Sequence, residues 1–105
     1  LPEEFLESMA EVIRLIGPPL RLRILEYLDL HGETTVSEII SGITGPQSAV
    51  SQHLNKMRLA GIVACRREGR QIFYRIAAVN AVTILNCLRG KYRSLRESGS
   101  PERRA

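Results

Sequence analysis

The stretch GPQSAVSQHLNKMRLAGIV, residues 45–63, decides the fold of this chain. It opens on Gly45-Pro46 and closes on Gly61, which favour a helix start and a helix stop. The apolar residues between these ends recur mostly at helical spacing and are expected to face a core: Val50, Leu54, Met57 and Leu59. The opposite side carries short hydroxyl and amide side chains. The stretch therefore predicts a helix over about residues 46–60 with one buried and one free polar face.

Three helices are predicted before this one. Residues 3–16 place apolar side chains at helical spacing and acidic ones in the first turn, where the helix dipole favours them. A second helix is expected over about residues 19–30, before the stop signal His31-Gly32. A short third helix, about residues 36–42, should begin at Thr35, because Glu38 stands where a capping box requires it.

The pattern changes after Gly61. Strand-forming residues lie on both sides of Arg66-Arg67-Glu68-Gly69-Arg70, so residues 62–76 predict a two-stranded hairpin with these arginines at its tip. A long last helix is expected over about residues 78–96. The chain would then form one domain, residues 1–96, and a disordered tail, residues 97–105.

This order of elements predicts a mainly α fold with a small β-hairpin, a winged helix-turn-helix. In that architecture the second helix of the helix-turn-helix enters the major groove of DNA, and glutamine and serine side chains bond to base edges. Charge supports a polyanionic partner, because residues 1–50 carry a net charge of −5 and residues 51–105 one of +9. The predicted DNA-binding residues are Gln47, Ser48, Ser51, Gln52, His53, Lys56, Arg66, Arg67 and Arg70. The alternative is a winged-helix protein-interaction module that does not read DNA.

Several of these segments resemble the ArsR/SmtB family of bacterial repressors. The similarity lies in Gln47 to Leu54, Leu59 to Val63, Arg66 to Arg70 and Tyr74 to Ile76, with Pro19 to Leu25 upstream. The resemblance implies a homodimer joined through its first and last helices, bound to a palindromic operator in double-stranded DNA. It also implies repression that an inducer relieves, and it places Gln47, Ser48, Ser51, Gln52 and His53 at DNA-contacting positions and Arg67 and Arg70 on the wing.

Metal sensing is common in that family, but its ligand sets do not occur here. The predicted third and fourth helices contain no cysteine, and residues 78–95 contain no His, Asp or Glu. The two histidines, His31 and His53, lie at a helix end and on the expected DNA face. Since zinc or nickel needs about four suitable ligands, we expect neither a metal site nor a cofactor.

The two cysteines leave the inducer open. Cys87 lies where some relatives that respond to sulfide or oxidants carry one reactive cysteine, but their second, in the second helix, is replaced here by Glu26-Tyr27-Leu28. Cys65 would have to take the place of that second cysteine, and together with Cys87 it would form a thiol switch or a site for arsenite. The other interpretation is that both cysteines are small buried hydrophobic residues.

Other function classes find little support in the sequence. Cys65 with His53 is the only conceivable nucleophile–base pair, and no acid stands in a plausible orienting position, so no catalytic residues and no enzyme activity are expected. No apolar run approaches the length of a membrane span, and no signal peptide is recognisable. A cytoplasmic protein with no membrane partner is therefore expected.

Overall fold

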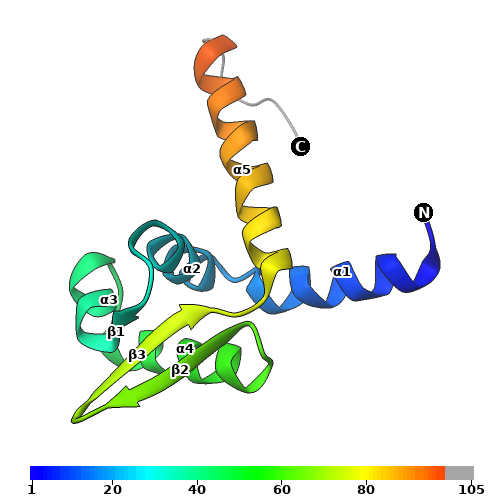
Figure 1. Cartoon of the computed structure of the whole chain (residues 1–105). Coiled ribbons are helices and arrows are strands. Elements are labelled where there is room, and N and C mark those ends of the chain that lie inside the picture. The colour runs from blue at the N-terminus through cyan, green and yellow to red at the C-terminus, as the bar shows by residue number, and fades with distance from the viewer. Residues whose placement is uncertain (99–105) are drawn as a thin grey trace.

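The computed structural model describes residues 1–98. Figure 1 shows helices packed around a small sheet, with the first and last helices extending from this body. The elements are α1 (Glu3–Ile16), α2 (Pro19–His31), β1 (Thr34–Thr35), α3 (Val36–Gly42), α4 (Gln47–Leu59), β2 (Val63–Glu68), β3 (Gln71–Ile76) and α5 (Val79–Ser98).

Local signals in the sequence explain most of these boundaries. The Thr35 hydroxyl accepts a hydrogen bond from the Glu38 backbone N–H, and the Glu38 carboxylate accepts one from the Thr35 backbone N–H, so the predicted capping box is confirmed. Pro46 stands directly before α4, and the positive φ of Gly61, 80°, lets the chain leave that helix. The predicted order, four helices, a hairpin and a last helix, is confirmed.

One core joins the helix-turn-helix to the sheet and to the start of α5. Each helix contributes at least one fully buried side chain, and α2 and α4 contribute three each. The buried apolar residues are Ile16, Ile24, Leu25, Leu28, Ile39, Val50, Leu54, Met57, Ile62, Val63, Ala81 and Leu85. Because α4 is anchored on this core along one side, its opposite side is presented at a defined orientation.

Leu59 corrects the predicted pattern of α4. Its side chain is 71% exposed rather than buried. At about 100° per residue, a position two after Met57 lies roughly on the opposite side of the helix. The core face of α4 therefore consists of Val50, Leu54 and Met57 alone.

The sheet has three strands rather than the predicted two, in the order β1-β3-β2. Thr34 and Thr35 pair with Tyr74 and Phe73 of β3, and both antiparallel pairings share β3 as the central strand. The hairpin tip is also shorter than expected. Glu68 pairs with Gln71, so only Gly69 and Arg70 form the turn, and Arg66 and Arg67 lie within β2.

The ends of α1 and α5 leave large apolar side chains uncovered. Phe5, Leu6 and Ile13 on α1 are about half exposed, and Leu88 and Tyr92 on α5 are 48% and 62% exposed. Over residues 1–98, none of the helices has the length and low polarity needed to cross a membrane. The tail predicted for residues 97–105 lies outside the described residues except for its first two, which belong to α5.

Candidate DNA interface

The polar face of α4 is open to solvent along its length. Its exposed side chains are Gln47, Ser48, Ser51, Gln52, Asn55 and Lys56. No side chain caps the N-terminus of this helix, so its first backbone N–H groups are available to an anion. Hydroxyl and amide groups at this reach can donate to and accept from base edges, and Lys56 adds a positive charge on the following turn.

His53 is partly buried and has a partner that the sequence did not reveal. The Nε of Arg21, on α2, donates a hydrogen bond of 2.9 Å to Nδ1 of His53. Burial lowers the pKa of His53 below its ordinary value, and the charges of Arg21 and Lys56 lower it further. The imidazole therefore sits at the rim of the α4 face as a neutral group.

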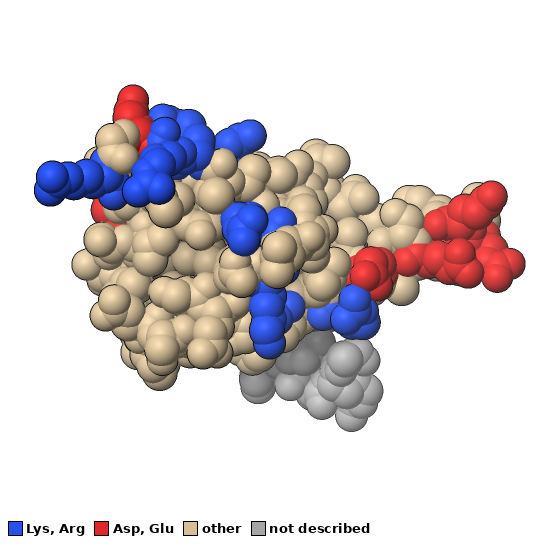
Figure 2. Space-filling model, turned by 90° about the horizontal axis from the view of Figure 1, so that it is seen from below, with Lys and Arg blue, Asp and Glu red and all other residues tan. Residues whose placement is uncertain are grey.

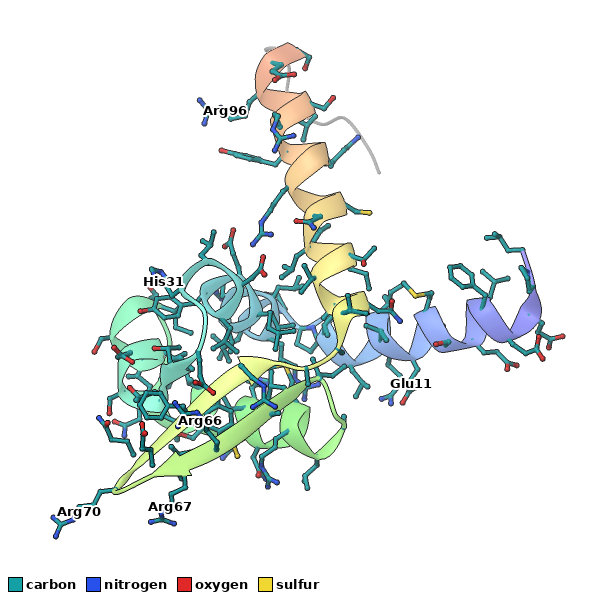
Figure 3. All side chains as sticks on the ribbon, in the orientation of Figure 1. Glu11, His31, Arg66, Arg67, Arg70 and Arg96 are labelled. Carbon is teal, nitrogen blue, oxygen red and sulfur yellow. The ribbon has the colours of Figure 1, made fainter. Side chains whose placement is uncertain are left out.

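The three predicted arginines of the wing differ in their surroundings. Figure 3 shows Arg67 and Arg70 pointing away from the body of the molecule at the hairpin end, whereas Arg66 lies over the strands. Nε of Arg67 donates a 3.2 Å hydrogen bond to the carbonyl of Gly69 in the same turn, and within residues 1–98 its side chain forms no ion pair. Both Arg67 and Arg70 are exposed and can approach a phosphate without giving up an ion pair.

Arg66 is held by a carboxylate. Its Nε and Nη2 lie 2.9 Å from the oxygens of Glu33, and its Nη1 lies 3.4 Å from Glu68. Its guanidinium also covers the ring of Phe73 at 4.7 Å. Hydrogen bonds from Arg66 lower the pKa of Glu33, so this carboxylate stays ionised well into the acidic range. Any phosphate would have to compete with Glu33 for this arginine.

The surface charge is divided between the two ends of the molecule. In Figure 2, Lys and Arg gather over the hairpin end and continue across the body, while Asp and Glu cluster on the projecting end of α1. The acidic cluster includes Glu3 and Glu4 in the first turn of that helix. The field of the protein thus favours approach of a polyanion to the side that carries the wing.

Cys65 and Cys87 are both free and exposed. The interpretation of both as buried hydrophobic residues is therefore wrong for the single chain. Cys65 lies on β2 beyond its buried first residue, Val63, and Cys87 lies on α5 beyond its buried residues Ala81 and Leu85. Within the described residues, no three or more His, Cys, Asp or Glu side chains gather into a group that could hold a metal ion.

Comparison with known proteins places this geometry in a family. Residues 18–64 match the family model described as bacterial regulatory protein, arsR family. The chain is 43% identical over 70 residues to an HTH-type transcriptional regulator of Methanocaldococcus jannaschii, which covers 67% of this chain and 79% of that protein. The chain belongs to the ArsR family.

Other members of the ArsR family agree in sequence and in structure. The HTH-type transcriptional repressor SmtB of Mycobacterium tuberculosis is 36% identical over 76 residues, 72% of this chain and 56% of SmtB. The crystal structure of the transcriptional repressor PagR of Bacillus anthracis has a TM-score of 0.73 and 36% identity over 83% of this chain and 99% of that chain. As a family member, this chain is a DNA-binding transcriptional repressor and not an enzyme.

The exposed face of α4 was predictable from the sequence, but the residues that bind two of the predicted contact residues, His53 and Arg66, were not. Arg21 and Glu33 were not among the predicted site residues, yet they bind His53 and Arg66. Arg21 had a weak signal, since it is one of three basic residues in the acidic first half of the chain. Nothing local marked Glu33, because its partner lies 33 residues away.

Proposed function

We propose that this protein binds, as a homodimer, a palindromic operator in double-stranded DNA, represses transcription there, and leaves the operator when an inducer acts on it. The observation that carries the proposal is the free polar face of α4 beside the cationic wing, anchored on a single core. The predominance of basic side chains on that side favours the backbone of a duplex. The protein would work in the cytoplasm, where bacterial DNA lies.

The proposed contacts divide by chemistry. Gln47, Ser48, Ser51 and Gln52 read base edges from the N-terminal half of α4, where a recognition helix meets the major groove. His53, Lys56 and the wing arginines Arg67 and Arg70 would contact the sugar–phosphate backbone. Arg66 would do so only after it is released from Glu33. Specificity would then reside in α4, and the salt dependence of binding in the cationic groups.

The exposed apolar side chains support the proposed dimer. Phe5 and Ile13 on α1 and Leu88 and Tyr92 on α5 leave a large apolar surface that a second copy can cover. A symmetric pair would place two recognition helices about one turn of DNA apart. Sedimentation velocity should accordingly give a mass near twice the 11.8 kDa of one chain.

The operator proposal can be tested by selecting duplexes from a random-sequence pool. Inverted repeats should be enriched, with half-sites about 10 bp apart between centres. Gln52→Ala and Ser51→Ala should each weaken binding of the selected duplex by about 1–3 kcal/mol per lost base contact. Ser94→Ala, an exposed serine on α5, is the matched control and should bind normally. Retention of the selected duplex by the α4 variants as by the control would contradict the proposal.

The proposed inducer acts on thiols, because both cysteines are open to reagents. Modification of Cys87, midway along α5, would alter the helix proposed to join the two copies and so change the spacing of the recognition helices. Cys87→Ser should bind the selected duplex like the parent but no longer release it on addition of hydrogen peroxide, a persulfide or arsenite. Cys65→Ser separates the roles of the two thiols. Release from the Cys87 variant at the parental reagent concentration would show that this thiol is not the sensor.

A further inference from the structure

Arg21 connects three helices through one guanidinium. Its Nη1 donates a 2.7 Å hydrogen bond to the backbone carbonyl of Leu15, in the last turn of α1. Its Nε donates a 2.9 Å hydrogen bond to Nδ1 of His53 on α4. Both bonds are partly buried, and both originate from a side chain near the start of α2. Arg21 thus ties the ring of His53 on α4 to α1 and α2.

The chemistry of the two groups determines where the imidazole proton lies. A guanidinium keeps its protons throughout the accessible pH range and has no acceptor atom. Nδ1 of His53 must therefore offer a lone pair to Arg21, which it can do only if the ring is neutral and its proton is on Nε2. Within residues 1–98, Nε2 of His53 is not a buried atom that lacks a partner, and the residue as a whole is partly exposed.

The charges around the ring act in the same direction. Arg21 faces it from α2 and Lys56 follows it on α4, and both disfavour a second proton. From α1 the nearby group is the uncharged Leu15 carbonyl, which Arg21 itself occupies. Nε2, the ring nitrogen that Arg21 does not bind, is then the atom that would donate to the same DNA backbone that Lys56 would approach.

We propose that Arg21 is a positioning residue for DNA binding: it holds His53 as the neutral tautomer that donates its Nε2–H to a backbone phosphate. In this contact the donor, the imidazole of His53, carries no formal charge, whereas the wing arginines would contact phosphates as cations. This inference rests on the proposed function, since it assigns one atom of the DNA-binding surface.

The tautomer is measurable in the free protein. In the imidazole ¹⁵N spectrum, Nε2 of His53 should show the shift of a protonated nitrogen and Nδ1 that of an unprotonated one. Arg21→Met should mix the two tautomers and move the titration of His53 up toward its ordinary pKa of 6.5. Arg21→Lys keeps one donor and should retain part of the tautomer preference. A wild-type ring protonated at Nδ1 would overturn the inference, and this result requires neither DNA nor a variant.

DNA binding provides the second readout, with a random-sequence duplex of 30 base pairs as the probe. His53→Ala and Arg21→Met should each weaken binding at pH 8 about three- to tenfold for each chain that contacts the duplex, as expected for one lost hydrogen bond per chain. Arg21→Met should have no further effect when His53 is already alanine. Because a neutral imidazole neutralises no phosphate, His53→Ala should leave the slope of log K against log salt unchanged. Loss of a cationic contact would reduce that slope by about 0.9 per phosphate.

The outcomes separate this inference from the proposed function. An Arg21→Met effect of equal size in the His53→Ala background would show a merely structural role and overturn the inference while leaving DNA binding intact. A flatter salt slope for His53→Ala would show that His53 contacts the phosphate as a cation and would overturn the inference. Failure of the wild-type protein to bind the duplex at 50 mM salt would instead overturn the proposed function, and the phosphate contact with it.

Discussion

The three arginines of the wing should contribute unequally to DNA binding, although they lie within five residues of one another. Arg70 makes no hydrogen bond or ion pair within residues 1–98, and Arg67 donates only to the carbonyl of Gly69. Arg66 is neutralised by Glu33 and Glu68. Three single replacements by alanine, Arg66→Ala, Arg67→Ala and Arg70→Ala, therefore form a matched series on one hairpin. Each removes one positive charge, but only the last two remove a charge that is free to meet a phosphate.

The expected size follows from counterion release. Each phosphate contact that is lost reduces the slope of log K against log salt by about 0.9, and a dimer has two wings, so one replacement reduces it by about 1.8. Between 50 and 200 mM salt, a fourfold change, this amounts to about twelvefold in affinity. When the salt rises from 50 to 200 mM, the affinity of the parent should thus fall by a factor about twelve times larger than the affinity of Arg67→Ala or Arg70→Ala. Arg66→Ala should match the parent within error.

Fluorescence anisotropy with a labelled duplex of 30 base pairs measures these slopes directly. Glu33→Gln extends the series, because it removes the carboxylate that holds Arg66. The released arginine could then contact a phosphate on each wing, so the salt slope should become steeper than that of the parent. The reasoning would be refuted if Arg66→Ala flattened the slope as much as Arg70→Ala, since Glu33 would then not compete with DNA. Equal slopes for all four variants and the parent would show that the wing is not part of the DNA interface.

The remaining predictions concern the scaffold that presents α4. A Cβ at Gly42 would overlap the ring of Tyr27, so Gly42→Ala should destabilise the protein by about 1–3 kcal/mol in urea unfolding. Gly90→Ala, where a Cβ would meet nothing within 4 Å, should be neutral or up to about 1 kcal/mol stabilising. A Gly42→Ala protein as stable as the Gly90 control would contradict this packing. Thr35→Ala removes the cap of α3 and should cost about 1 kcal/mol, seen as a lower urea midpoint with an unchanged m-value. Hydrogen bonds from Thr34 and Thr35 lower the pKa of Glu38, so its stabilising contribution is complete above its ordinary pKa of 4.5 and is lost as the pH falls through the lowered value. The difference in melting temperature between the parent and Glu38→Gln should therefore shrink from pH 7 to pH 3, and a difference independent of pH would show that the carboxylate is not responsible.

The sequence alone determined the features that depend on neighbours a few residues away. The start of α3 follows from Thr35 and Glu38, one turn apart, and α4 ends just before Gly61, which has a positive φ. The free face of α4 was predictable because Val50, Leu54 and Met57 point to one side and leave mostly polar residues on the other, although Leu59 was wrongly assigned to the core. Periodicity and capping are local properties, and they can be recognised in the chain before it folds.

Only the tertiary structure decided which of the polar residues are free. His53 receives its partner from 32 residues away and Arg66 from 33 residues away, distances over which the sequence carries no signal of pairing. The two-residue strand β1 escaped detection for a related reason, since so short a segment has no periodicity and forms only against β3. The exposure of Cys65 likewise depends on which part of β2 other elements cover. These features arise from contacts between elements, and packing, rather than local propensity, brings those elements together.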